Sequence, residues 1–253
     1  MRVLTRSIVL LSKGMRRDPT MYGSQSSASQ SIPPALVPQV EEIVLGILNP
    51  VPLRDYALAA DGGMIFDELT WSFQERDSAF QSHPPYIVLD DDICPGRCWH
   101  LSSTRGQVGI SLPQFIHPTF VSIDHIPRAI AADIGQAPRR MVLWGVVDGV
   151  ENRERYARRM HALRANSALL RDHPPLTKDD YVFIELADFV YNITQVRTVQ
   201  TFPIREDVRQ LDIDIGVVVL EIIDNWGSNS TCVYRVRIHG TEGEKELSSD
   251  MVV

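Results

Sequence analysis

The sequence predicts an all-β fold, an antiparallel β-sandwich, on three observations. Seven runs alternate apolar and polar residues with a period of two, as strands with one buried face do. Short turns separate the runs, and several strands at such spacing are typical of a sandwich. With 253 residues, 44% of them hydrophobic, the chain can bury a substantial core. The runs are 107–112, 119–126, 140–147, 181–192, 196–202, 217–223 and 232–240.

The segments at either end of the chain lack this alternation. Residues 1–33 are basic and then rich in serine and glutamine, a composition that cannot bury a core, so we expect them to be disordered. A basic arm that contacts lipid or nucleic acid is the functional alternative for this stretch. Residues 243–253 are expected to form a flexible tail.

Two helices are predicted outside the strand pattern. A leading helix is expected over 37–49, where apolar residues recur at i, i+3, i+4 and i+7 and Pro50 ends the pattern. An Arg-rich helical insertion is expected over 151–171, packed on the sandwich by one apolar stripe with its arginines in solvent. The stripe consists of Tyr156, Met160, Leu163 and Leu170.

Composition and motifs exclude several function classes. A net charge of -7 argues against an obligatory nucleic-acid surface. No stretch approaches the roughly 20 apolar residues that cross a bilayer, so the chain is expected to be soluble as given. There is no nucleophile elbow, phosphate loop or metal-hydrolase pattern, and the sequence therefore predicts a protein that is not an enzyme.

Three cysteines remain to be assigned. Cys94 and Cys98 have no second pair, and His100 alone does not complete a zinc set. Cys98 lies at the first strand region and Cys232 in the last, so their sulfurs can connect the beginning of a β-fold to its end. Two small buried thiols in a reducing compartment are the alternative. Cys98 with a histidine base would be a thiol nucleophile only if no disulfide forms.

The order of several motifs resembles one family. The succession resembles the SUN domain of nuclear-envelope bridging proteins, of fungal type, over residues 38 to 240, with a domain expected over 34–242. In such an ordered series each motif supports the others. The motifs are Pro85 before a strand, an acidic loop followed by Gly96, Cys98 and Trp99, HPTFVSIDHIP (117–127), APRR (137–140), NWG (225–227) and CVYRVRIHG (232–240).

The resemblance implies several structural features. It implies a jelly-roll sandwich of the galactose-binding-like type and a Cys98–Cys232 disulfide, which leaves Cys94 as a buried thiol or a site of intermolecular exchange. It also implies a loop that wraps a monovalent cation, potassium, with backbone carbonyls, and no catalytic cofactor. A solvated acidic turn is the alternative, and the spacing of a calcium EF-hand is absent. The cation ligands by register are Ile87, Asp90, Asp92, Arg97 and Tyr234.

The resemblance also implies a function. SUN domains form homotrimers and bind the C-terminal peptide of KASH proteins as an added strand beside a lid hairpin, here expected over 64–83. His125 and Tyr234 match the residues that contact the peptide and would donate hydrogen bonds to its carboxylate. Gln136 and Ser230 occupy pocket positions but depart from the usual residues. The rival is a carbohydrate-binding sandwich, with Trp71, Trp99, Trp144 and Trp226 as sugar platforms.

The same resemblance implies a location. The domain would lie in the perinuclear lumen, held at the inner nuclear membrane by a transmembrane segment that this chain lacks, as in a truncated gene product. Bridging of the inner and outer nuclear membranes is the expected role. Two sequons, at Asn192 and Asn229, fit exposure to the lumen, and the second lies near Cys232.

Overall fold

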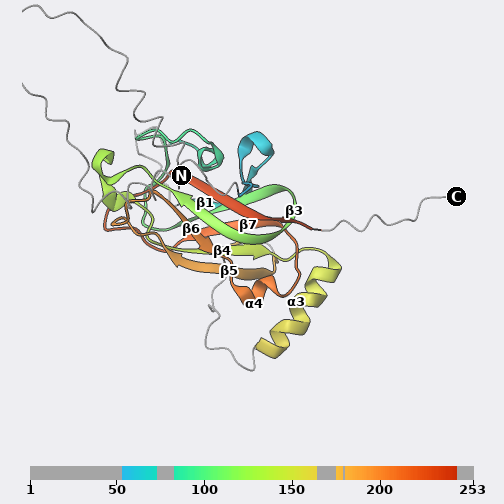
Figure 1. Cartoon of the computed structure of the whole chain (residues 1–253). Coiled ribbons are helices and arrows are strands. Elements are labelled where there is room, and N and C mark those ends of the chain that lie inside the picture. The colour runs from blue at the N-terminus through green and yellow to red at the C-terminus, as the bar shows by residue number, and fades with distance from the viewer. Residues whose placement is uncertain (1–52, 73–82, 164–174, 179, 244–253) are drawn as a thin grey trace, which may run out of the picture. The chain divides into compact units, whose positions relative to one another are not determined.

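The computed structural model describes residues 53–72, 83–163, 175–178 and 180–243 (Figure 1). These residues form nine strands, all paired antiparallel, which confirms the predicted antiparallel β-sandwich. The predicted segments 1–33 and 37–49, and residues 244–253 of the predicted tail 243–253, lie outside the described residues. The strands are β1 (Met64–Ser72), β2 (Trp99–Leu101), β3 (Gly106–Asp124), β4 (Arg140–Val146), β5 (Phe183–Val190), β6 (Val199–Pro203), β7 (Ile215–Ile222), β8 (Thr231–Val233) and β9 (Arg235–Glu242).

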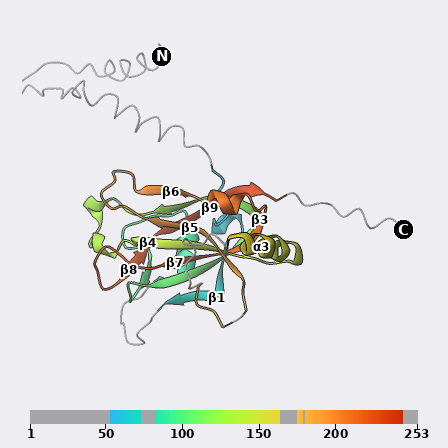
Figure 2. The ribbon, with the colours of Figure 1, turned by 90° about the horizontal axis from the view of Figure 1, so that it is seen from below.

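Strand β3 organises the sheets. Its first half pairs with β1 and β7, and β4 and β5 continue that layer in the order β1-β3-β7-β4-β5. Its second half pairs with β6 on one side and β9 on the other. Figures 1 and 2 show this long strand running through the fold with β6 and β9 beside its end. A separate two-stranded sheet joins β2 to β8.

The bend in β3 follows from its prolines. Pro113 and Pro118 have no N–H to give to a ladder, and such residues occur in strands at irregularities. The pairing register of β3 shifts between Ser111 and Ile116 against β7, and between Pro118 and Phe120 against β9. The strand changes partners at this point, so that one strand contributes to both layers of the sandwich.

One main core lies between the layers. Residues from both halves of β3 belong to the same buried cluster as residues of β4, β5, β7 and β9. Alternate residues of β4 enter this core and a second buried cluster on the opposite face of the sheet, so residues 141–146 are all buried and the predicted single buried face does not hold for this strand. Fully buried members include Ile110, Val121, Leu143, Leu186, Leu220 and Ile238.

The Arg-rich insertion is helical and packs on the sandwich. Helix α3 spans Val150–Leu163, which confirms the predicted helix over its first part, whereas 164–171 lie outside the described residues. The Asn152 amide donates to the Asp214 carboxylate at 2.7 Å, and the Tyr156 hydroxyl donates to the Phe183 carbonyl at 3.1 Å. The short helix α4 (Glu206–Arg209) lies nearby (Figure 1).

Two local predictions are wrong. Pro85 does not precede a strand but begins a 3₁₀ helix, Pro85–Leu89, because its fixed φ suits the first turn of a helix. The predicted lid over 64–83 is not a separate hairpin in its first half. Residues 64–72 are strand β1, held in the main sheet by pairing with β3, while 73–82 lie outside the described residues.

The disulfide between Cys98 and Cys232 is present, with 5.5 Å between the two Cα atoms. Cys98 precedes β2 and Cys232 lies in β8, opposite His100 in the ladder. The bond therefore fastens the loop before β2 to the strand that leads into β9. Cys98 cannot act as a thiolate nucleophile in this state.

A buried ion pair fixes the entry of the chain to the last strand. The Asp55 carboxylate accepts a hydrogen bond from Arg235 Nη2 at 2.9 Å. It also accepts hydrogen bonds from the backbone N–H groups of Ala57 and Ile238. The Asp55 and Arg235 side chains are only 10% and 8% exposed. The side chains of the neighbouring pair, Arg54 and Glu242, are 50% and 59% exposed.

Among the described helices, none has the length and apolar character needed to cross a membrane.

Cys98→Ser should lower the free energy of unfolding by up to about 4 to 5 kcal/mol, because the bridge closes a separation of 134 residues and restrains the unfolded chain. Urea denaturation measures the change. Cys94→Ser is the matched control and should leave stability unchanged, since Cys94 is exposed and outside the bridge. Peptide mapping that finds Cys94 joined to Cys98 would contradict this assignment.

Asp55→Asn should destabilise the domain by about 3 to 5 kcal/mol, because it leaves the Arg235 charge buried without its partner. Glu242→Gln breaks the adjacent exposed pair and should cost less than about 1 kcal/mol. Both changes are measured by chemical denaturation at neutral pH. Equal effects from the two substitutions would show that the buried pair does not anchor the entry segment.

Candidate functional site

A cavity of about 480 Å³ lies beside the Cys98–Cys232 disulfide. Its walls come from the loop before β2, the segment after β3 and the junction of β8 with β9. Of the four predicted peptide-binding residues, three line the cavity, His125, Gln136 and Tyr234, whereas Ser230 does not. His83, the last residue of the predicted lid, also lines the cavity. The sequence did not assign other lining residues to this site, among them Pro95, His100, Ile126, Ile130 and Ala131.

The loop before β2 is fixed to the cavity by two bonds. The disulfide holds Cys98, and the Gly96 N–H donates to the Tyr234 hydroxyl at 3.1 Å. Gly96 has a φ of 82°, a left-handed conformation that other residues adopt at a cost of roughly 1 to 2 kcal/mol. The loop therefore depends on a glycine at this turn.

His125 lies at the end of β3, where its side chain is packed into the wall. Its imidazole Nδ1 is 3.0 Å from the Ile126 carbonyl oxygen, and the ring meets Tyr234 edge to face at 4.8 Å between centroids. The residue is 4% exposed, and its Nε2 is buried with no hydrogen-bond partner among the described residues. Burial lowers the pKa of His125, although the bond to Ile126 opposes the shift.

The hydrogen bonds of these two side chains define what they offer a ligand. A carbonyl only accepts, so the proton of the neutral His125 ring is on Nδ1 and Nε2 is an acceptor. The Tyr234 oxygen accepts from Gly96, and its O–H donates to no other described residue. Burial raises the pKa of Tyr234 and keeps this proton in place. The neutral pocket thus offers one donor and one acceptor, whereas the sequence predicted two donors.

Gln136 and Ser230 form a pair at the edge of the cavity. The Gln136 side-chain amide donates to Ser230 Oγ at 2.9 Å. The Asn225 amide of the NWG motif donates to the carbonyl of Ser230 at 2.8 Å and to that of Ser228 at 3.0 Å. Ser230 therefore does not line the cavity itself but supports Gln136, which does.

Arg97 neutralises part of the acidic loop. Its guanidinium pairs with Asp90 at 2.5 Å and with the Asp92 carboxylate at 2.9 Å, and it donates to the Asp92 carbonyl at 3.0 Å. The hydrogen bond from Arg97 holds the pKa of Asp90 below its usual value. Asp91 is exposed. Three aspartates against one arginine leave the loop negative.

A carboxylate metal site does not form in this loop. No group of three His, Cys, Asp or Glu side chains in the described ranges could hold a metal ion. The carboxylates of Asp90 and Asp92 are occupied by Arg97, and the Ile87 and Asp92 carbonyls each accept one hydrogen bond. A carbonyl oxygen has two lone pairs, so the Ile87 and Asp92 carbonyls can each accept one more contact.

Cys94 is exposed and forms no disulfide. Its thiol donates to Asp92 at 3.0 Å, and this bond raises the pKa of the thiol. A raised pKa lowers the fraction of reactive thiolate. The prediction of a buried thiol is therefore wrong, and Cys94 as a site of intermolecular exchange stays a prediction.

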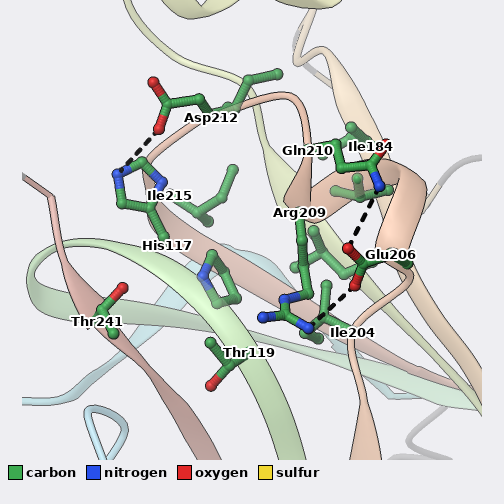
Figure 3. A pocket seen from close by; sticks show the side chains of 14 residues that line it. His117, Thr119, Ile184, Ile204, Glu206, Arg209, Gln210, Asp212, Ile215 and Thr241 are labelled. Atoms are coloured by element: carbon green, nitrogen blue, oxygen red, sulfur yellow. Dashed lines mark hydrogen bonds and ion pairs between the residues drawn. The ribbon is translucent and has the colours of Figure 1, made fainter.

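A second cavity, of about 330 Å³, lies where β3, β5, β9 and α4 meet (Figure 3). Its polar side chains pair with one another. His117 is 3.7 Å from the Asp212 carboxylate, and Glu206 accepts from Arg209 and Gln210 at 3.1 and 3.3 Å. In the described part of the chain, no buried side-chain atom lining this cavity lacks a partner. The unpartnered nitrogen of His125 therefore distinguishes the first cavity from this one.

The two sequons lie in different surroundings. Asn192 follows β5, and its side-chain amide oxygen accepts hydrogen bonds from the N–H and the hydroxyl of Thr194 at 2.9 and 2.7 Å. Asn229 is exposed. It directly precedes Ser230, which bonds to Gln136 at the edge of the cavity. A glycan on Asn229 would therefore lie closer to the cavity edge along the chain than one on Asn192.

The tryptophans do not form an open platform. Trp99 and Trp144 are 3% and 4% exposed. Trp226 is half-buried, donates its indole N–H to the Tyr191 carbonyl and is covered by the Arg139 guanidinium at 4.9 Å. Trp71 is half-buried in β1. Trp99 and Trp144 therefore serve as core residues, and Trp71 and Trp226 are only partly accessible to a ligand.

The chain is similar to known SUN proteins. SUN domain-containing protein 3 of Bos taurus is 30% identical over 204 residues, which is 76% of this chain and 48% of that protein. Sperm-associated antigen 4 protein of Mus musculus is 28% identical over 217 residues, or 80% of this chain and 41% of that protein. The chain spans about half the length of these curated relatives or less. They are mammalian and do not support the predicted fungal type.

Several solved structures are weakly similar to this chain. A family 32 carbohydrate-binding module from Streptococcus pneumoniae EndoD has a TM-score of 0.46 and 11% identity, covering 74% of this chain and 100% of that one. A fucolectin from striped bass has a TM-score of 0.43 and 13% identity, covering 76% of this chain and 48% of that one.

The family pattern of the Sad1 / UNC-like C-terminal domain matches residues 78–157 and 154–242. The chain therefore belongs to the Sad1/UNC-like, or SUN-domain, family.

Proposed function

We propose that this domain is an adaptor that binds the C-terminal peptide of a KASH protein in the cavity beside the disulfide. The observation that carries the proposal is a wall of two polar side chains whose hydrogen-bonding capacity the described residues do not use up. His125 Nε2 is buried without a partner among them, and the hydroxyl of Tyr234, whose ring lies 4.8 Å from that of His125, donates to none of them. Native proteins rarely leave buried polar atoms unpaired, and a ligand that pairs with them relieves a cost of about 1 to 3 kcal/mol. Family membership supports the same role.

The Tyr234 hydroxyl is the proposed donor to the peptide's terminal carboxylate. Its oxygen is oriented by the Gly96 N–H, which leaves the proton for a ligand. A hydrogen bond to a charged group contributes about 1.5 to 3 kcal/mol. Apolar side chains of Ile126, Ile130 and Ala131 line the same cavity and would contact the last apolar atoms of the peptide.

The remaining parts of the adaptor role are proposed from the family. The domain acts as a homotrimer in the perinuclear lumen, at the inner nuclear membrane, and connects it to the outer membrane through its KASH partner. The peptide adds as a strand that ends in this cavity. No nucleic acid or catalytic cofactor takes part, and we propose a binding role and no enzymatic one.

We also propose a potassium ion in the loop of residues 87–97, held by the carbonyls of Ile87, Asp90, Asp92, Arg97 and Tyr234. When bound, the ion would supply a positive centre that keeps these carbonyls pointing inward. The negative net charge of the loop supports a cation, and the use of its carboxylates by Arg97 supports main-chain ligands. Carbohydrate binding is disfavoured by the burial of the tryptophans.

Tyr234→Phe should weaken binding of a free-acid KASH C-terminal peptide about tenfold or more without unfolding the domain, because it removes the donor to the carboxylate. Amidation of the peptide should have a similar effect. The measurement is calorimetric titration of the full chain fused at its N-terminus to a trimeric coiled coil. Tyr181→Phe, which removes a hydroxyl bonded to Glu68 outside the cavity, is the control and should bind normally. Equal binding of amidated and free-acid peptides would refute the carboxylate pocket.

Exchange of potassium for a bulky cation such as choline should weaken peptide binding, because the loop loses the ion that orients its carbonyls. Gly96→Val should weaken binding as well, since it strains a positive φ and disturbs the bond to Tyr234. Asp91→Asn is the control and should bind like the wild type, because carbonyls and not this exposed carboxylate hold the ion. Equal losses for Asp91→Asn and Gly96→Val would instead indicate a carboxylate site.

A further inference from the structure

The loop between β5 and β6 contains the Asn192 sequon, and its hydrogen bonds hold the asparagine at a fixed place on the surface. The Gln200 side-chain amide accepts a hydrogen bond from the Asn192 N–H at 2.9 Å and donates one to the Asn192 carbonyl at 2.7 Å. The Tyr191 hydroxyl donates to the Thr198 carbonyl at 2.8 Å and so joins the two ends of the loop. The backbone around Asn192 is therefore fixed from both ends.

The two polar atoms of the Asn192 side chain are used differently. Its Oδ1 accepts the hydrogen bonds from the N–H and the hydroxyl of Thr194. Its Nδ2 donates to no described residue and is not among the buried atoms that lack a partner, so it is accessible from solvent. An N-linked sugar is attached at the amide nitrogen and leaves the oxygen free to accept. The folded loop can therefore carry a glycan without losing any of these hydrogen bonds.

Three exposed valines lie close to this asparagine in the sequence. Val190, the last residue of β5, is 48% exposed, Val196 in the loop is 87% exposed, and Val199, the first residue of β6, is 41% exposed. Among the described strands, β6 pairs only with β3, which makes it an edge strand. Apolar side chains beside an edge strand favour association with other chains. A bulky, hydrophilic group at this place would prevent such association.

We propose that Asn192 is an N-glycosylation site and that the first sugars of its glycan cover the three valines. Asn192 Nδ2 forms a bond to the anomeric carbon of a lipid-diphosphate-linked oligosaccharide. The bond from that carbon to the diphosphate oxygen breaks, the lipid diphosphate leaves, and the amide nitrogen loses one proton. The inference rests on the proposed location, because this transfer takes place in the lumen of the endoplasmic reticulum, which is continuous with the perinuclear space.

The second sequon lacks this combination of features. Asn229 is exposed, but Thr231 of the same triplet is 0% exposed, and its hydroxyl donates to the Ser103 carbonyl at 2.9 Å. In the described part of the chain, no large hydrophobic residue after Val199 is exposed. A glycan on Asn229 would therefore cover no exposed apolar side chain of its own segment, and the proposal concerns Asn192 alone.

Glycan mapping tests the site. The full chain is directed into the endoplasmic reticulum of cultured cells by an added signal peptide, with a reporter sequon in the fused tag. Only molecules with a glycosylated reporter are counted, since these have entered the lumen. Asn192→Gln and Thr194→Ala should each cause the loss of one glycan, measured by peptide mass spectrometry before and after glycosidase treatment, whereas Thr194→Ser keeps the hydroxyl and the glycan. An unmodified Asn192 beside a glycosylated reporter would overturn the assignment.

Light scattering tests whether the glycan covers the valines. The Asn192→Gln protein should aggregate at a lower concentration than the glycosylated wild type, and adding Val196→Asp should reverse this shift. Val150→Asp is the matched control, because Val150 is 75% exposed at the start of α3, outside the loop, and it should not reverse the shift. Equal aggregation of wild type and Asn192→Gln would show that the glycan covers no apolar surface.

Peptide binding separates this inference from the proposed function. None of residues 190–199 lines the cavity beside the disulfide, so Asn192→Gln should bind a KASH C-terminal peptide like the wild type. A glycosylated protein that does not bind the peptide would remove the adaptor function and leave the glycan assignment standing. A protein that binds the peptide with Asn192 unmodified would do the reverse.

Discussion

The candidate site depends on one constraint, the attachment of the loop before β2 to the junction of β8 and β9. The Cys98–Cys232 disulfide makes this attachment covalent, and the Gly96 N–H repeats it through the Tyr234 hydroxyl. These segments are far apart in sequence, and no long ladder joins them, because β2 and β8 pair over only three residues. Without the attachment the cavity would lose a wall, and Tyr234 would lose the bond that orients its proton.

The attachment also explains how a small site achieves selectivity. A hydroxyl that already accepts one hydrogen bond can present its proton in a defined direction, and a histidine anchored through Nδ1 presents only its lone pair. Burial strengthens both effects, because an unpaired polar atom away from water is costly. The cavity wall therefore contains polar groups that no described residue pairs with, and a complementary ligand can form hydrogen bonds with them.

Much of the architecture was predictable from the sequence, because apolar runs between turns mark the strands, even for β4, which is buried on both faces. Helix α3 followed from its apolar stripe, and the disulfide followed from the family resemblance. The lid prediction failed for 64–72, since pairing of these residues with β3 is a long-range contact that local pattern does not encode. The strand predicted after Pro85 is wrong for a similar reason. A short apolar run after a proline is compatible with a strand and with a 3₁₀ helix, and the local sequence does not distinguish them.

The chemistry of the site was only partly predictable. Motif positions identified His125, Gln136 and Tyr234, but hydrogen-bond polarity depends on partners such as the Ile126 carbonyl and Gly96, which only the fold brings together. Pro95 and Ile130 carry no local signal for a binding role. Arg97 was expected as a carbonyl ligand, and its guanidinium proved to neutralise Asp90 and Asp92 as well.

The most direct test of the account is an isotope-filtered NOE experiment on the trimerised full chain bound to a peptide labelled only at its C-terminal residue. The account predicts contacts from that residue to the ring protons of His125 and Tyr234, and to the methyl groups of Ile126 and Ile130. Contacts with the second cavity, for example with Ile184 or Ile215, or contacts from upstream peptide residues alone, would contradict the claim that the cavity beside the disulfide binds a peptide terminus.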